Sequence, residues 1–133
     1  MKLIIAGSRT INPSSTFLEA CISEAHLRPT EIISGGAPGV DASAKALTEQ
    51  RFTMTYYSLA LKDKYTEFPA NWNKHGKAAG PIRNIAMAEY GDALLLIWDG
   101  ESRGSKNMKE TMLELGKPVY EVILRSYNVP EET

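Results

Sequence analysis

The chain has 133 residues, of which 43% are hydrophobic and 23% are charged, as is ordinary for one globular domain. Its formal net charge of −1 argues against a protein that coats nucleic acid by bulk charge. No stretch approaches the roughly 18–20 apolar residues of a membrane span, and the single cysteine, Cys21, suits a reducing cytoplasm. We therefore expect a soluble cytoplasmic domain with neither a membrane nor nucleic acid as its main partner.

Segments typical of strands and of helices alternate along the chain. Short runs rich in aliphatic or aromatic residues predict five strands, at 2–6, 32–33, 53–59, 93–98 and 119–124. Apolar residues at helical spacing predict four helices, one opened by Asn12-Pro13 and closed by Pro29 and the others at about 39–51, 81–90 and 104–115. The polar stretch at 60–80 is expected to be irregular, and connections of that length often form binding loops.

This alternation predicts an α/β fold, namely a single Rossmann-like three-layer domain around a five-stranded, mostly parallel sheet. We expect residues 1–124 to form the domain and residues 125–133 to form a polar tail. In such sheets, ligands bind outside the carboxyl ends of the strands, at the point where the strand order reverses. The loops that follow the strands are therefore the candidates for a binding site.

Three of these loops are rich in glycine and polar residues. Gly7-Ser8-Arg9 follows the first predicted strand, while residues 34–41 and 99–105 follow the second and fourth and lead straight into helices. Glycines let backbone N–H groups approach a ligand closely, and helix N-termini favour anions. The three loops together predict a ligand that carries phosphate, held by the backbone amides of Gly35 to Gly39.

A fourth segment, Gly80-Pro81-Ile82-Arg83-Asn84, places an arginine at the start of a helix, where its guanidinium offers a bidentate clamp for phosphate. Better-known nucleotide motifs do not match. The dinucleotide pattern would need glycine where Ser34 stands, and residues 53–60 contain no carboxylate to bind a ribose. With one cysteine and two distant histidines, we expect no metal site, and we expect no cofactor.

In their order and composition, these motifs resemble the YspA/YpsA-related branch of the SLOG superfamily. The matching segments are Gly7-Ser8-Arg9, Ser34-Gly35-Gly36-Ala37-x-Gly39-Val40-Asp41, Gly76-Lys77-x-Ala79-Gly80-Pro81-Ile82-Arg83-Asn84 and Asp99-Gly100-x-Ser102-x-Gly104. That superfamily has a Rossmann-like fold. It includes the Lonely Guy phosphoribohydrolases, DNA-processing proteins of natural transformation, and sensor domains for NAD- or ADP-ribose-derived signals. The resemblance implies a nucleotide-type ligand and a homo-oligomer, with contacts on the exposed faces of the helices that carry Met87 and Met108/Met112.

A comparison with the Lonely Guy enzymes bears on catalysis. Their R-K-x-x-M helix resembles residues 83–87, and their P-G-G-x-G-T-x-x-E turn resembles the segment around Gly100 and Gly104-Ser105. Their catalytic glutamate falls on Met108, whose thioether can neither stabilise an oxocarbenium-like centre nor transfer a proton. This difference favours binding over hydrolysis.

Three functions therefore stay open. The first is the binding (sensing, carrying or sequestering) of a nucleoside monophosphate or an ADP-ribose-type ligand. The second is N-glycosidic or phosphoribosyl hydrolysis, with Asp41 or Asp99 acting together with Arg83. The third is the binding of single-stranded DNA, which the balanced charge makes a weaker hypothesis. The expected ligand-binding residues are Gly7, Ser8, Arg9, Ser34, Gly35, Gly36, Ala37, Gly39, Val40, Arg83, Asn84, Asp99, Gly100, Ser102, Gly104 and Ser105.

Overall fold

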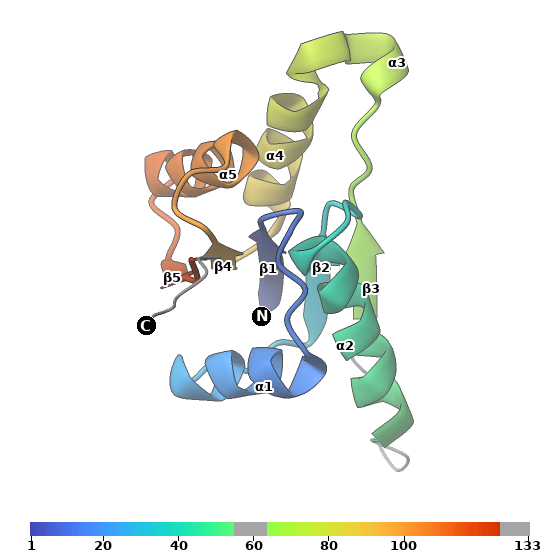
Figure 1. Cartoon of the computed structure of the whole chain (residues 1–133), viewed down its shortest axis with the longest axis vertical. Helices are drawn as coiled ribbons and strands as arrows, with labels where there is room; N and C mark the ends of the chain where they lie inside the picture. The colour runs from blue at the N-terminus through green and yellow to red at the C-terminus, as the bar shows by residue number, and fades with distance from the viewer. Residues whose placement is uncertain (55–63, 126–133) are drawn as a thin grey trace, which may run out of the picture.

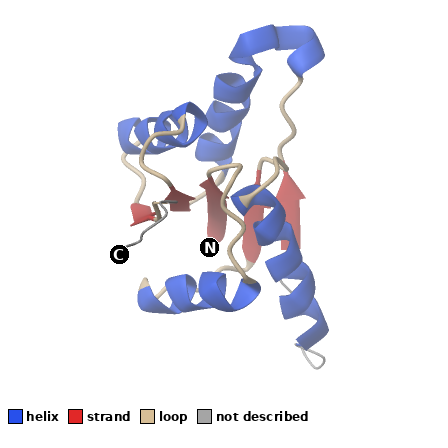
Figure 2. Cartoon of the chain, viewed as in Figure 1, coloured by secondary structure: helices blue, strands red, loops and turns tan. Residues whose placement is uncertain are grey.

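The computed structural model describes residues 1–54 and 64–125, which form a five-stranded parallel sheet between two layers of helices (Figures 1 and 2). The strand order is β3-β2-β1-β4-β5, and every neighbouring pair is parallel. The strands are β1 (Lys2–Gly7), β2 (Glu31–Ser34), β3 (Lys64–Glu67), β4 (Ala93–Trp98) and β5 (Val119–Ile123). The predicted Rossmann-like α/β fold is thus confirmed.

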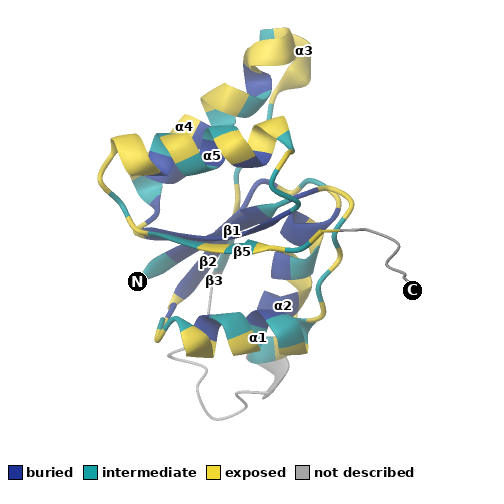
Figure 3. Cartoon of the chain, turned by 60° about the vertical axis from the view of Figure 1, so that its left-hand side comes forward, coloured by how far each residue is buried: buried dark blue, intermediate teal, exposed yellow. Residues whose placement is uncertain are grey.

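The helices connect consecutive strands and cover both faces of the sheet (Figure 3). They are α1 (Ser15–Glu24), α2 (Val40–Met54), α3 (Trp72–His75), the 3₁₀ helix η1 (Gly76–Ala78), α4 (Ala79–Tyr90) and α5 (Arg103–Glu114). In the described residues, no helix combines the length and the apolar composition needed to cross a membrane.

The alternation of side chains along each strand produces two hydrophobic cores. In β1, Leu3 and Ile5 face α1 and α2, whereas Ile4 and Ala6 face α4 and α5. All six residues of β4 are buried, as expected for a central strand that is covered on both faces. Because helices cover both faces of the sheet, the strands themselves can be reached by a ligand at their ends.

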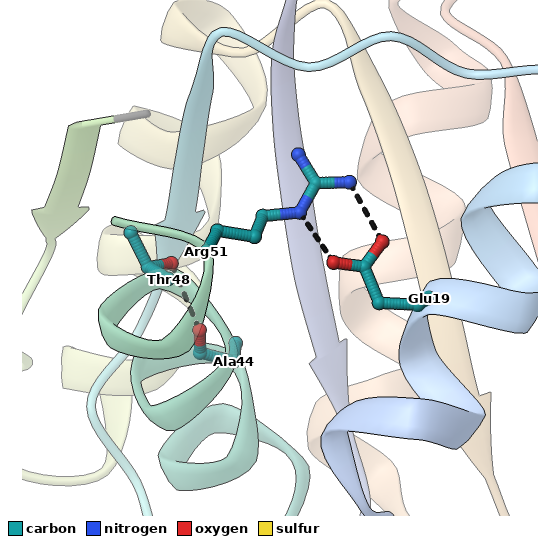
Figure 4. A network of polar contacts seen from close by, with 4 residues as sticks. All are labelled: Glu19, Ala44, Thr48 and Arg51. Atoms are coloured by element: carbon teal, nitrogen blue, oxygen red, sulfur yellow. Dashed lines mark hydrogen bonds and ion pairs between the residues drawn. The ribbon is translucent and has the colours of Figure 1, made fainter. Parts of the chain in front are cut away.

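A bidentate ion pair joins the two helices on the α1/α2 face (Figure 4). Nε and Nη2 of Arg51, in α2, donate to Oε2 and Oε1 of Glu19, in α1, at 2.8 and 2.9 Å. Next to it in α2, the Thr48 hydroxyl donates to the carbonyl of Ala44 at 3.0 Å. This pair lies across the sheet from the α4/α5 layer, so a substitution in it is a control for substitutions on that other layer.

Three sequence-based expectations about local structure are wrong. The N-cap of α1 is Ser14, whose hydroxyl accepts the N–H of Phe17 at 3.1 Å, in place of Asn12. The predicted strand at 53–59 is wrong for its first two residues, because α2 continues to Met54. Residues 55–59 lie outside the described residues. Strand β3 is formed instead by Lys64–Glu67, within the stretch that was expected to be irregular. That stretch also contains α3 and η1.

Candidate functional site

A cavity of about 700 Å³ lies at the carboxyl ends of the strands. Its walls come from the turn after β1, the glycine-rich loop after β2, the segment between β3 and α3, the first turns of α4, and the start of α5. The strand order reverses between β1 and β4, and the cavity includes the loops that follow both of them. Of the predicted site residues, it is lined by Gly7, Arg9, Gly35, Gly36, Ala37, Asp41, Arg83, Asn84, Ser102, Gly104 and Ser105.

The other predicted residues support this cavity from behind or lie beside it. Ser8 is buried, and its hydroxyl accepts the N–H of Asp99 at 3.1 Å, which ties the β1 and β4 loops together. The hydroxyl of the buried Ser34 contacts the Tyr65 hydroxyl at 2.7 Å. Val40 is fully buried in the α1/α2 core. Gly39 and Gly100 do not line the cavity and occupy turns with φ of 82° and 87°.

Asp99 has a structural role in the loop before α5. Its Oδ1 accepts the N–H groups of Glu101 and Ser102 at 2.8 and 2.9 Å, and these hydrogen bonds hold the pKa of its carboxyl below the usual value. The carboxylate does not line the cavity. The structure therefore separates Asp99 from Asp41, the other carboxylate that was considered for catalysis.

Several chemically important lining residues were not predicted from the sequence. They are Glu67, Trp72, Lys77, Arg103 and Asn107. Trp72 and Lys77 belong to the stretch that was expected to be irregular, and Arg103 begins α5 one residue earlier than predicted. Met108 also lines the cavity, although only 1% of it is exposed.

The charges that line the cavity favour an anionic ligand. Four cations, Arg9, Lys77, Arg83 and Arg103, face two carboxylates. The described residues contain no group of three or more His, Cys, Asp or Glu side chains that could hold a metal ion. Three of the four cations are arginines, and a guanidinium can bind two oxygens of one phosphate at once.

Arg83 is held in position from three directions. Its Nη1 donates to the carbonyls of Gly35 and Phe68 at 2.8 and 3.2 Å, and its Nε donates to Oδ1 of Asn84 at 3.0 Å. Asn84 in turn donates to Oδ1 of Asn107 at 2.9 Å, which links α4 to α5. Within residues 1–54 and 64–125, no hydrogen bond uses Nη2 of Arg83, so one edge of the guanidinium is open to a ligand.

The carboxyl group of Asp41 is buried and accepts a hydrogen bond from the backbone of the glycine-rich loop. Burial raises its pKa to about 6, although hydrogen bonds from the backbone at Ala37 and Gly35 and the charges of Arg83 and Arg9 act in the opposite direction. The Ala37 N–H donates to Oδ2 of Asp41 at 3.2 Å, and the Gly36 N–H donates to the Ser34 hydroxyl at 3.3 Å. Three of the amides expected to hold phosphate, those of Gly35, Gly36 and Ala37, therefore already act on protein acceptors.

The N-terminus of α5 offers more open donors. Its N-cap, Ser102, makes no side-chain capping bond, and the Ser102 hydroxyl donates instead to that of Ser105 at 2.8 Å. The first amide of α5 with a backbone acceptor is that of Lys106, which donates to the Ser102 carbonyl at 3.1 Å. The first turn has no acidic residue, and a Cβ added at Gly104 would meet no atom within 4 Å. This helix end combines N–H groups that have no backbone acceptor among the described residues, open space and a positive dipole, as an anion site requires.

No protein-family model matches the chain. Among curated proteins it is similar to the Gene 61 protein of Mycobacterium phage D29, with 30% identity over 125 residues. The aligned region covers 89% of this chain and 93% of the phage protein. The similarity therefore extends over most of both chains and is not confined to one motif.

Proposed function

We propose that this chain, which belongs to the family of the Gene 61 protein of Mycobacterium phage D29, binds a phosphorylated, nucleotide-derived small molecule in the cavity. The observation that carries the proposal is the set of four cations lining a cavity that also contains the uncapped N-terminus of α5. The cavity volume lies within the roughly 300–1,000 Å³ that small-molecule sites occupy. The resemblance to the SLOG superfamily supports the same class of ligand, including ADP-ribose-type molecules.

The phosphate is proposed to bind at the start of α5 instead of on the amides of Gly35 to Gly39. The amides of Gly36 and Ala37 are engaged by Ser34 and Asp41. In the first turn of α5, the described residues provide no backbone acceptor before the amide of Lys106, and a Cβ added at Gly104 would meet no atom within 4 Å. Arg103 and Arg9 line the cavity, and Nη2 of Arg83 is available for a second phosphate.

Binding is expected to raise the melting temperature of the protein. At a ligand concentration of about 100 times the dissociation constant, linkage adds roughly 2.7 kcal/mol to the free energy of unfolding. For a domain of this size, the melting temperature then rises by about 5–15 °C. The measurement is a thermal melt with AMP, ADP and ADP-ribose and their counterparts with other bases. An unchanged melting temperature across this panel would contradict the proposal.

Gly104→Glu should separate ligand binding from stability. A carboxylate in the first turn of α5 interacts favourably with the helix dipole, so the free energy of unfolding should stay equal or rise by about 0.3–1 kcal/mol. The same charge should repel phosphate and weaken binding at least tenfold, by about 1.4 kcal/mol. Gly104→Gln is the matched control, because it has the same size without the charge and should weaken binding less. Calorimetric titration with ADP tests this, and an unchanged affinity in Gly104→Glu would move the phosphate away from α5.

Hydrolysis of an N-glycosidic bond is a second candidate function, and the pKa of Asp41 favours it. A carboxyl group with a pKa of about 6 in a ligand-sized cavity can act as a general acid or base near neutral pH. The test is to incubate nucleotides with the protein and to separate the nucleotides and their products by chromatography. A free-base peak that grows with time and is absent in Asp41→Asn would support hydrolysis, whereas its absence in the wild type would leave binding alone.

Self-association stays a proposal that rests on the resemblance. Met87, Met108 and Met112 are themselves buried in the α4/α5 core and cannot form the contact. The large exposed hydrophobic residues on the same two helices are Ile82, Ile85 and Leu113. Light scattering is expected to show a dimer, and a monomer at micromolar concentration would contradict this proposal.

A further inference from the structure

Glu67, at the carboxyl end of β3, lines the cavity beside the glycine-rich loop. In the parallel register of β2 and β3 it lies opposite Ser34, immediately before that loop. A Cβ added at Gly36 would lie 2.5 Å from Oε2 of Glu67, and Gly36 has a φ of 75°. The carboxylate therefore lies directly against the backbone of Gly36, at the position where the loop turns.

The two oxygens of this carboxylate have different surroundings. Oε1 accepts the hydroxyl of Tyr65 at 3.0 Å, and the same hydroxyl contacts Ser34 at 2.7 Å. In the described part of the chain, no group donates to Oε2. One oxygen thus fixes the orientation of the group while the other is left as a hydrogen-bond acceptor.

A carboxylate at this place selects for hydroxyl groups on the ligand. It repels phosphate, and so it orients an anionic ligand with its phosphates toward Arg103 and the start of α5. In Rossmann-type sheets, a carboxylate about 20 residues after the glycine-rich turn binds ribose hydroxyls. The dinucleotide pattern would place such a carboxylate within 53–60, which contains none. The strand next to the glycine-rich loop is β3, and it ends further along the chain, at Glu67.

The wall next to Glu67 is suited to the remainder of a nucleoside. The chain continues from β3 to α3 (Figure 1). Along this path, Pro69, Ala70 and Trp72 line the cavity. Trp72 is 55% exposed, so its ring is available for stacking on a base.

The start of α5 follows β4, which is three inter-strand spacings of roughly 4.8 Å each from β3. A nucleoside diphosphate reaches across this distance better than a monophosphate.

We propose that Glu67 binds the 2′- and 3′-hydroxyls of a ribose, so that the site takes ribonucleotides in preference to 2′-deoxyribonucleotides. This inference rests on the proposed nucleotide-binding function and adds the sugar class and the orientation of the ligand. The phosphates lie at α5, the ribose lies at Glu67, and the base lies at Trp72.

The test is calorimetric titration of the full chain with ADP, GDP, CDP and UDP and with the four corresponding 2′-deoxynucleoside diphosphates. For the base that binds most tightly, the ribose form is expected to bind about 10- to 100-fold more tightly, as a hydrogen bond to a charged acceptor predicts. In Glu67→Ala this ratio should fall to about twofold or less, and in Glu67→Gln it should be intermediate. Glu101→Ala removes a carboxylate that does not line the cavity, and it should keep the wild-type ratio.

The outcomes separate this inference from the function on which it rests. Nucleotide binding without a preference for ribose, or a preference that persists in Glu67→Ala, would overturn the role of Glu67 and leave the proposed function intact. No binding of any of these nucleotides to the wild-type protein would overturn the proposed function and this inference with it. Melting curves of both Glu67 variants would show that they fold.

Discussion

Asp41→Asn is expected to raise the free energy of unfolding by about 2–3 kcal/mol at pH 8 and to change it little at pH 4. Burial raises the pKa of Asp41 to about 6, from an ordinary value of 3.8. A tenfold change in a proton-binding constant between the unfolded and folded states corresponds to about 1.4 kcal/mol of stability. Above pH 6 the folded protein must keep a buried charge that the unfolded chain exposes to water. Asparagine removes this cost and keeps an oxygen that can accept the Ala37 N–H.

The pH dependence of stability has a definite sign. Between about pH 4 and pH 6, the folded state binds a proton at Asp41 that the unfolded state has released, so stability falls as pH rises through this window. Urea unfolding of wild type and variant at a series of pH values measures the difference. Asp99→Asn is the control with the opposite sign, because the pKa of Asp99 is lowered and its contribution is lost as pH falls below about 4. A difference between wild type and Asp41→Asn that does not depend on pH would contradict this account.

The elements with strong local signals could be predicted from the sequence. The apolar run of β4 and the helical stripe of α5 lie where periodicity placed them, within one residue at most termini. The glycine-rich segments after β1, β2 and β4 could also be assigned to one edge of the sheet, because consecutive parallel strands place their carboxyl ends together. The parallel order of the strands thus predicted the edge of the sheet at which the cavity lies.

Strand β3 and the residues around it could not be predicted in this way. Its sequence, Lys-Tyr-Thr-Glu, has no apolar run, since an edge strand gains its order from pairing with β2 and not from burial on two faces. Because the strand was predicted at 53–59, Glu67 fell within the stretch expected to be irregular and was not among the predicted site residues. α3 has four residues and none of them is buried, so no hydrophobic periodicity in the sequence predicts this helix. The position of Trp72 at the cavity could therefore not be predicted either.

Hydrogen bonds inside the glycine-rich loop were also beyond sequence reasoning. Three residues of that loop, Gly35, Gly36 and Ala37, match what a phosphate-binding turn requires. Only the geometry shows that Asp41 and Ser34 already accept the N–H groups of Ala37 and Gly36. A glycine-rich pattern indicates that a close approach occurs, but it does not say whether the approaching group is a ligand or a side chain of the same chain.

Arg83→Met is expected to lower the free energy of unfolding by about 2–3 kcal/mol at pH 8 and by less at pH 5. The carbonyls of Gly35 and Phe68 lose their shared donor, and each half-buried acceptor left unpaired costs about 1 kcal/mol or more. Loss of the guanidinium also removes a charge that lowers the pKa of Asp41, so that carboxyl becomes more costly to ionise. At pH 5 Asp41 is mostly protonated in the folded protein, and only the hydrogen-bond component remains.

A double-mutant cycle with Asp41→Asn separates these two components. In the Asp41→Asn background there is no buried charge, so Arg83→Met should cost less at pH 8, and the difference measures the electrostatic coupling between the two side chains. Arg51→Met is the matched control, because its ion pair with Glu19 lies across the sheet. It should leave the nucleotide-induced rise in melting temperature unchanged, whereas Arg83→Met should remove much of it. An additive cycle at pH 8 would mean that Arg83 acts only through its hydrogen bonds to the two carbonyls, and burial, backbone hydrogen bonds and the charge of Arg9 would then have to explain the pKa of Asp41.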